Sequence, residues 1–330
     1  MAEKVTIATV ARQARVSRQT VSNVLNAPHI VREETRQRVQ EAIDSLGYRV
    51  SQAARQMRTG RSRLIAVRIE PTRDGINGSV LDRFLHGLTE TAETAGYRTM
   101  LYTAGDDESE IAAYDDLLTA YDLDGFVLTG TDHGDPRTAW LAERGVAFVT
   151  FGRPWDDLTA HPWVDVDGAA GTALATAHLL AHGHRRIGFL GWPPGSGVGD
   201  DRRSGWRETL RAAGADPTGL DRATEDGIAE GERLMRDLLV VADPPTAVVC
   251  ASDSLAFGAL QAVRAADSAV ALIGFDDTPV AAAVGLTSVS QPLAEAAARC
   301  VDLLTAVLDG DHQTPDPVLL QPSLVLRHTA

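Results

Sequence analysis

The chain has 330 residues, of which 44% are hydrophobic, and its formal net charge is −14. This length is too great for one ordinary core and predicts two or three domains. The two cysteines, Cys250 and Cys300, lie in apolar contexts, which excludes a disulfide framework and a thiol-rich metal site. The N-terminus is amphipathic, unlike a signal peptide, and no run approaches the roughly 18 apolar residues of a membrane span. We therefore expect a cytoplasmic protein without a membrane partner.

The charge is divided unevenly along the chain. Residues 1–63 carry 12 Arg and Lys against 5 Asp and Glu, a balance of +7, whereas the remainder carries 19 against 40, a balance of −21. A small basic segment on a large acidic body indicates a DNA-contacting module joined to a part that must stay off DNA. A solvated basic tail is the alternative, and the helical patterning of the segment opposes it.

Three short helices are predicted in the basic segment. Thr6 can cap a helix whose apolar residues recur at three- and four-residue spacing. The chain breaks at Arg15, and Ser17 can then cap a second helix over about 18–26. A third helix is predicted over about 33–46. Two short helices joined by a tight turn are what a helix-turn-helix requires.

The outward face of the second helix carries the chemistry of major-groove readout. Arg18, Gln19, Ser22 and Asn23 face outward there. Arginine can pair with guanine through two hydrogen bonds, and Asn or Gln can do the same with adenine. A generic three-helix bundle, the alternative, predicts Glu and Lys on this face. The face contains no acidic residue, which favours DNA binding.

The segments VTIATVARQARVSRQTVSNVLN and VREETRQRVQEAIDSLGYR closely resemble the DNA-binding headpiece of the lactose/galactose repressor family of bacterial transcriptional regulators. The resemblance implies that Arg18, Gln19 and Asn23 read bases. It places Thr6, Ser17, Thr20 and Ser22 near the DNA backbone, where contacts position without specifying. The family usually has glycine at the turn where this chain has Arg15. A left-handed non-glycine residue there costs about 1 kcal/mol, although its side chain can contact a phosphate.

The next segment, VSQAARQMRTGRSR, falls where the family has a hinge helix that folds on the operator and inserts an apolar wedge into the minor groove. The resemblance makes Ser51 a cap, Ala54 a small packing residue, Arg55 a DNA contact and Met57 the wedge. Eight or so residues cannot hold a helix alone, so the hinge needs its dimer mate and bent DNA. A plain flexible linker is the alternative.

From Leu64 onward, apolar runs alternate with amphipathic stretches. Parallel sheets with crossover helices are the expected result, arranged as two lobes with a ligand between them. The predicted strands are LIAVRIE, YRTMLY, GFVLTG, VAFVTF, RRIGFLGW, TAVVCAS and AVALIGFD. The predicted helices lie near 79–95, 109–121, 136–144, 168–182, 203–213, 227–240, 254–265 and 293–308. The fold class is therefore α/β, with an all-α headpiece.

The body resembles the effector-binding core of the same family, which is itself like periplasmic sugar-binding proteins. The motifs VDVDGAAGTALATAHLLAHGHRRIGFLG, DDRRSGWRETLRAAG, ASDSLAFGALQAVR, IGFDDTPVA and SVSQPL carry this resemblance. It implies lobe crossings near 161–164, 290–293 and 321–323, with the last long helix returning to the first lobe. The expected divisions are a headpiece 1–49, a hinge and linker 50–61 and a core 62–330, in which lobe one takes 62–161 and 292–321 and lobe two takes 164–290 and 322–328.

The resemblance also proposes effector ligands. Arg202 stands at the position of a sugar-clamping arginine, Asp276 at that of a carboxylate accepting sugar hydroxyls, and Ser252 where Asn is usual. Further candidates are Arg153, Trp155 and Trp192 near the cleft, and Asp74 in a loop that lacks the family's usual Asn-Pro-Phe-Phe run. Guanidinium, carboxylate and indole groups suit a sugar or oligosaccharide. Trp163 also falls near a cleft loop, and core packing is an equal alternative for each tryptophan.

Other motifs carry no catalytic or cofactor assignment. His178, His182 and His184 lack carboxylate or cysteine partners at ligand spacing, and we interpret them as cations at a helix C-terminus rather than a metal site. GWPPGSGVGD lacks the Lys-Ser/Thr of a phosphate loop and is expected to be a mobile cleft loop. No Ser/His/Asp arrangement occurs in a nucleophile context, so we predict neither an enzyme nor a cofactor.

The leading hypothesis is a homodimeric repressor of a pseudo-palindromic double-stranded operator, released by a small carbohydrate effector. The chain ends shortly after QPSLVLR without a heptad tail, so dimers rather than tetramers are expected. A sugar-binding protein without a DNA role is one alternative, which the basic segment opposes. An enzyme such as a sugar hydrolase or kinase is another, without a catalytic constellation. A corepressor-type regulator with a non-sugar effector stays open.

Overall fold

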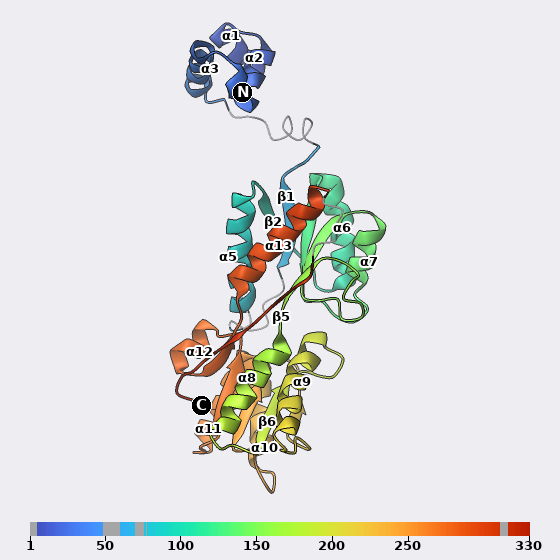
Figure 1. Ribbon diagram of the computed structural model, residues 1–330, viewed down its shortest axis with the longest axis vertical. Helices are drawn as coiled ribbons and strands as arrows, with labels where there is room; N and C mark the ends of the chain where they lie inside the picture. Colours follow the sequence, from blue (N-terminus) through green and yellow to red (C-terminus); the bar gives the residue numbers. More distant parts are fainter. Residues whose placement is uncertain (1–4, 49–59, 70–75, 77, 311–315) are drawn as a thin grey trace. The chain divides into compact units, whose positions relative to one another are not determined.

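The computed structural model divides the chain into two units, Met1–Ser62 and Arg63–Ala330 (Figure 1). The residues that it describes are 5–48, 60–69, 76, 78–310 and 316–330.

Three helices and a single turn form the first unit. They are α1 (Ile7–Ala14), α2 (Arg18–Asn26), the 3₁₀ turn η1 (Pro28–Ile30) and α3 (Glu33–Leu46). Val10, Val21 and Val39, one from each α-helix, are completely buried in the core between the three helices. The predicted 3.6-residue spacing of apolar positions is confirmed, because each helix buries the side that carries its apolar residues and exposes its polar side.

The first lobe of the second unit is built on a six-stranded parallel sheet in the order β11-β5-β4-β3-β1-β2. Its strands are β1 (Leu64–Ile69), β2 (Arg98–Thr103), β3 (Gly125–Thr129), β4 (Ala147–Phe151), β5 (Trp163–Val166) and β11 (Val318–Leu320). All five residues of β3 are buried, as expected for a central strand covered on both faces.

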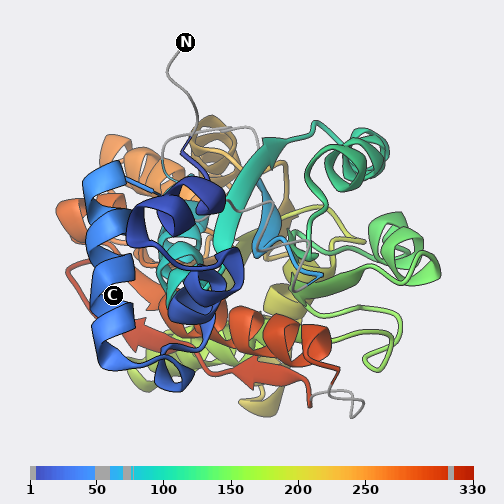
Figure 2. The ribbon, with the colours of Figure 1, turned by 90° about the horizontal axis from the view of Figure 1, so that it is seen from above.

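Two pairs of helices cover this sheet. They are α5 (Gly78–Thr94) with α13 (Leu293–Leu308), and α6 (Asp107–Tyr121) with α7 (Pro136–Glu143). Figures 1 and 2 show α6 and α7 side by side, away from α5 and α13. The buried residues accordingly form two clusters, one around Phe84 and Leu304, the other around Tyr114 and Phe126. The expected return of the last long helix to the first lobe is confirmed.

The second lobe repeats the plan, with strand order β12-β10-β9-β8-β6-β7 and only β12 antiparallel within this sheet. Its strands are β6 (Ile187–Gly191), β7 (Asp221–Ala223), β8 (Ala247–Cys250), β9 (Ala271–Phe275), β10 (Thr287–Ser290) and β12 (Ser323–Val325). Its helices are α8 (Gly168–Ala181), α9 (Gly197–Ala212), α10 (Ile228–Leu239), α11 (Asp253–Ala265) and α12 (Pro279–Val284). The predicted α/β class is confirmed.

Both sheets reverse direction of winding at a switch point, between β1 and β3 in the first and between β6 and β8 in the second. Ligands bind at the carboxyl ends of strands at such points. Both sheets therefore provide the geometry for a binding cleft.

Two details differ from the sequence prediction. The first crossing between lobes lies after Val166 rather than near 161–164, because β5 pairs with β4 in the first sheet. Helix α9 begins at Gly197, six residues before the predicted start, so the glycine-rich segment is partly helical. In the described part of the chain, no helix is long and apolar enough to cross a membrane.

Candidate functional sites

The turn before α2 is set by two residues. Arg15 adopts the left-handed conformation, with φ 54° and ψ 47°, and ends α1. The Ser17 hydroxyl then accepts the backbone N–H of Thr20 at 3.0 Å and caps α2. The strain at Arg15 costs about 1 kcal/mol, and the cap returns a similar amount. Together they fix the direction in which α2 leaves the turn.

The exposed face of α2 carries the predicted base-reading residues. Arg18 and Gln19 are exposed and Asn23 is half-buried. The Gln19 side-chain amide donates to Asn23 Oδ1 at 3.0 Å, so the two amides are held side by side before any contact is made. Ser22 lies on the same helix and Thr20 is tied to the cap by a 2.9 Å hydroxyl contact with Ser17. Thr6 caps α1 in a reciprocal arrangement with Thr9.

Several predicted contacts fall outside the described residues. These are Ser51, Ala54, Arg55 and Met57 of the expected hinge and Asp74 of the expected effector loop. They stay predictions.

A cleft of about 1300 Å³ runs between the lobes of the second unit. Its first-lobe side is formed at the ends of β1, β2 and β3, and its second-lobe side at the loop after β6, the start of α9 and the loop after β9. This is the switch-point position in both sheets. Ligand pockets for small molecules usually hold about 300–1000 Å³, so the cleft has room for more than one sugar ring.

Arg202 and Asp276 meet at the second-lobe side of this cleft. Arg202 Nη1 donates to the carbonyl of Ala251 at 2.5 Å and lies 3.5 Å from Asp276 Oδ1. Its guanidinium stacks 3.7 Å from the ring centre of Phe275. Arg202 is 7% exposed, yet its Nε has no hydrogen-bond partner among the described residues. A buried donor without a partner is uncommon in proteins and marks this residue as one whose role needs an explanation.

The carboxyl of Asp276 is perturbed by its surroundings. Burial raises its pKa to about 8, against the opposing effect of the Arg202 charge, while Asp253 and Asp226 raise it further. Gln291, which also lines the cleft, donates to Asp276 Oδ1 at 2.7 Å. The backbone at Asp276 has φ 109°, a strained conformation for a non-glycine residue. Strain and a raised pKa at one cleft residue are typical of a functional group.

Two of the candidate tryptophans line the cleft. Trp155 Nε1 donates to the carbonyl of Thr131 at 3.1 Å, and its ring covers Gly197, where a Cβ atom would overlap it. The ring of Trp192 lies over Gly199, 3.1 Å from the place of a Cβ atom, and its Nε1 has no partner in the described chain. Trp163 is buried in β5 and donates to the carbonyl of Leu158, so it packs in the core.

Two predicted ligands do not line the cleft. Ser252 is fully buried, where its hydroxyl caps α11 and donates to Asp226. Arg153 lies behind the wall and bonds Asp165 at 2.6 Å. Burial acts to lower the pKa of Arg153, but Asp165 and Asp201 raise it above its usual value. These residues therefore shape the site rather than reach into it.

Sequence reasoning missed most of the carboxylates that line the cleft, among them Asp165, Asp201 and Asp226. Asp165 belongs to the VDVDG motif, and Asp201 is the second acid of DDRR, so both stood beside residues that were singled out. Nothing in their spacing distinguished them from solvated acids.

Two of the three histidines near the end of α8 differ from the predicted cations. Burial lowers the pKa of His178 and His184, which disfavours their charged forms. Among the described residues no group of three or more His, Cys, Asp or Glu side chains could hold a metal ion.

Comparisons with known proteins agree with this geometry. Residues 6–51 match the model of bacterial regulatory proteins of the lacI family, and residues 176–330 match that of a periplasmic binding protein-like domain. The HTH-type transcriptional regulator CelR of Thermobifida fusca is 32% identical over 98% of both chains. The HTH-type transcriptional repressor CytR of Escherichia coli K12 is 28% identical over 98% of this chain and 95% of its own.

Two solved structures resemble the chain over nearly its whole length. The lac repressor dimer bound to operator and the anti-inducer ONPF has a TM-score of 0.85 and 26% identity, covering 99% of each chain. The complex of CelR with cellobiose has a TM-score of 0.75 and 29% identity, covering 99% of this chain and all of the other.

Proposed function

Because the chain belongs to the lacI family of bacterial regulatory proteins, we propose that it represses transcription as a homodimer on a pseudo-palindromic operator and that a sugar or oligosaccharide releases it. The family membership makes the chain a DNA-binding transcriptional regulator and not an enzyme. The repressor mechanism, the effector and the residues that contact each are the proposal.

The acid-free exposed face of α2 carries the DNA half of the proposal. Arg18 and the paired amides of Gln19 and Asn23 present the donors and acceptors that distinguish guanine and adenine in the major groove. In a homodimer, two such helices would read two half-sites about one helical turn apart. The resemblance to an operator-bound repressor dimer supports this arrangement.

The DNA half is tested by footprinting and by titration of the footprinted site. Arg18→Ala is expected to weaken binding by about 1–3 kcal/mol and to relax the preference at one base pair of each half-site. Arg38→Ala is the matched control, because it removes the same charge from the exposed side of α3. Protection of a site without two-fold symmetry, or equal losses for both variants at every sequence, would contradict the proposal.

The Arg202–Asp276 pair carries the effector half. A planar guanidinium with an unpartnered Nε, a carboxylate and two indole faces match the hydroxyl edges and apolar faces of a sugar ring. The relative solved with cellobiose supports a carbohydrate effector. Effector binding would change the operator affinity by the difference between its affinities for the two lobe arrangements, typically 1–3 kcal/mol.

The effector half is tested by a thermal-shift screen of mono- and oligosaccharides, followed by operator titration with the best ligand. Arg202→Ala is expected to abolish the shift while operator binding is retained. Arg211→Ala, on the exposed side of the same helix, is the control. A ligand that strengthens operator binding would make the protein a corepressed regulator, and sedimentation showing a stable tetramer would contradict the dimer.

A further inference from the structure

One hydrogen-bonded contact between the lobes reaches the loop that carries Asp276. Arg83 belongs to α5 of the first lobe, one end of which lies next to α12 in Figure 1. Its Nη1 donates to the carbonyls of Asp276 and Asp277 at 3.4 and 3.1 Å. Both carbonyls belong to the loop between β9 and α12 of the second lobe. Arg83 therefore holds the backbone of a predicted effector ligand from the opposite lobe.

This loop has an unusual backbone. Asp276 has φ 109°, and Asp277 has φ 50°. The first value lies outside the left-handed range of about 50–70° that non-glycine residues sometimes adopt. Asp277 lies between the two carbonyls, and its left-handed turn allows both to reach the same Nη1 of Arg83. Such conformations raise the energy of the chain and persist only where neighbouring groups hold them. The two hydrogen bonds from Arg83 are part of that support.

The other hydrogen bonds that hold Asp277 come from its own lobe. Arg327 bonds the Asp277 carboxylate at 2.6 Å, and the Ser288 hydroxyl accepts the N–H of Asp277 at 3.0 Å. Both partners lie in or beside β10 and β12 of the second lobe. Arg327 and Arg83 thus hold the same loop from opposite lobes, and only the contact of Arg83 depends on how the lobes are arranged.

The carboxylate of Asp276 depends on where this backbone is held. Its Oδ1 accepts the Gln291 amide at 2.7 Å and lies 3.5 Å from Arg202 Nη1. Asp253 and Asp226 are the other charged groups that face it. Because a hydrogen bond weakens steeply when its geometry is lost, a movement of the loop would release the carboxylate from these partners.

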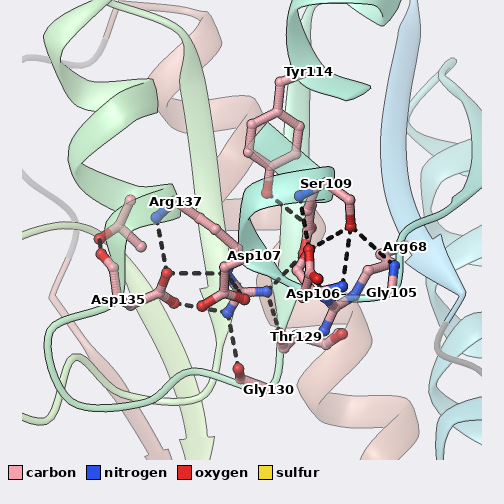
Figure 3. A network of polar contacts seen from close by, with 12 residues as sticks. Arg68, Gly105, Asp106, Asp107, Ser109, Tyr114, Thr129, Gly130, Asp135 and Arg137 are labelled. Carbon is pink, nitrogen blue, oxygen red and sulfur yellow. Dashed lines mark hydrogen bonds and ion pairs between the residues drawn. The ribbon is translucent and has the colours of Figure 1, made fainter. Parts of the chain in front are cut away.

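The buried charge network of the first lobe differs from this contact. Arg137 is 1% exposed, and its guanidinium bonds Asp135 at 2.7 Å, Glu110 at 3.0 Å and the carbonyl of Gly130 at 2.8 Å (Figure 3). These partners all belong to the first lobe, so a change in the lobe arrangement leaves their distances unchanged. The partners of Arg83 lie in the second lobe, and their distances must change.

Separation of the lobes would therefore remove the support of Arg83 and let the strained loop relax. We propose that Arg83 is a positioning residue that couples the arrangement of the two lobes to the position of the Asp276 carboxylate. This inference rests on the proposed function only for the role of Asp276 as an effector ligand. Its tests use the full-length protein without effector, so a failed sugar screen and a failed coupling are distinct results.

The first test is a pair of double-mutant cycles on the unfolding equilibrium constant, measured by denaturant titration. Arg153 also bonds a residue of the other lobe, so Arg83→Met and Arg153→Met remove two contacts that depend on the same lobe arrangement. Once one contact is lost and the lobes separate, the other contributes less. The double variant is therefore expected to unfold less readily, by about threefold or more, than the product of the two single effects predicts.

Arg327→Met is the matched control for this cycle, because Arg327 bonds the same loop from within the second lobe. Its effect is expected to multiply with that of Arg153→Met, as for independent sites. Multiplicative effects of Arg83→Met and Arg153→Met would overturn the coupling. Equal deviations in the two cycles would overturn it as well, because they would reflect the loop alone.

The second test measures whether Arg83 positions the Asp276 carboxylate. Burial raises the pKa of Asp276 to about 8, so stability falls as the pH rises from about 6 to about 8, where the folded state keeps a proton that the unfolded state has lost. Arg83→Met is expected to remove about half of this slope or more, because the released carboxyl reaches water and its pKa falls toward the usual range. Loss of a positive charge alone would raise the pKa and keep the slope.

Two further variants complete the pH test. Arg83→Lys keeps a cationic donor and is expected to retain most of the slope of the unchanged protein. Arg299→Met, which removes an exposed arginine of α13, is expected to leave the slope unaltered. A slope in the Arg83→Met variant that equals or exceeds that of the unchanged protein would overturn the assigned role of Arg83.

Discussion

Arg153 of the first lobe and Asp201 of the second form an ion pair between the lobes, with Nη2 and Oδ2 3.4 Å apart. Arg153 also bonds Asp165 at 2.6 Å, and Asp201 accepts the backbone N–H of Ala169 at 3.0 Å. Each partner is therefore anchored in its own lobe. The pair is therefore a direct contact between the two lobes, beside that of Arg83 with the carbonyl of Asp277 at 3.1 Å.

We predict that Arg153→Met and Asp201→Asn are not additive. Both residues are mostly buried, so their coupling should reach about 1–3 kcal/mol in a double-mutant cycle on the free energy of unfolding. Denaturant titration of the four proteins measures it. Additive effects would show that this pair does not join the lobes.

The stability of the protein should fall as the pH rises from about 4 to about 8. Burial raises the pKa of Asp276 to about 8, so between these limits the folded state binds a proton that the unfolded state has lost. Asp276→Asn removes this slope above pH 6. Below pH 6 a slope remains, because burial also raises the pKa of Asp253 to about 6.

Denaturant titrations at several pH values compare Asp276→Asn with Asp237→Asn, an exposed acid on α10. A slope in the Asp276→Asn variant equal to that of the unchanged protein would contradict the assignment. Effector affinity should rise over pH 6–9 in the unchanged protein, because the ionised carboxylate is the better acceptor of sugar hydroxyls.

Arg15→Gly should stabilise the first unit and weaken its hold on DNA. Glycine removes the left-handed strain, worth up to about 1 kcal/mol, which native-state hydrogen exchange at Val10 and Val21 measures. If Arg15 contacts a phosphate, the variant's DNA-binding constant depends less steeply on salt: the slope of its logarithm against the logarithm of the salt concentration falls in magnitude by about 0.9 for B-DNA. An unchanged slope would rule out the contact, and Arg38→Ala controls for charge alone.

Ser252→Ala should affect stability more than ligand binding. The Ser252 hydroxyl caps α11 by accepting the N–H of Leu255 at 3.2 Å, and loss of such a cap costs about 1–2 kcal/mol. Denaturant titration and calorimetry separate the two effects. Loss of effector affinity at unchanged stability would indicate that Ser252 contacts the effector, as the resemblance implies.

The elements with strong periodicity could be predicted from sequence. Helices α2, α3 and α13 begin and end at the predicted residues, and in α2 the Ser17 cap that was predicted is present. Strands β5, β7, β10, β11 and β12 were not predicted, since three or four residues carry no usable period and pairing partners far along the chain decide their state. The predicted start of helix α9 lay too far along the chain, because the first turn of this helix contains two glycines, which are rare in helix interiors.

The candidate site was predictable in its residue types more than in its contacts. Arg202, Asp276, Trp155 and Trp192 do line one cleft. Arg153 does not, because its partners Asp165 and Asp201 lie far from it in sequence and only the fold brings them together. Unpartnered groups such as Thr129 Oγ1 cannot be recognised at all until every neighbour has been placed.

Trp155 lies so close to Gly197 that the residue at either position limits which residues the other can accept. A larger residue at 197 would collide with the indole, so it can be accepted only in a lineage where residue 155 has already become small. Such a paired exchange would open the cleft on that side and admit a bulkier ligand. We therefore expect a change of effector preference during evolution to involve substitutions at both positions, first at residue 155 and then at residue 197.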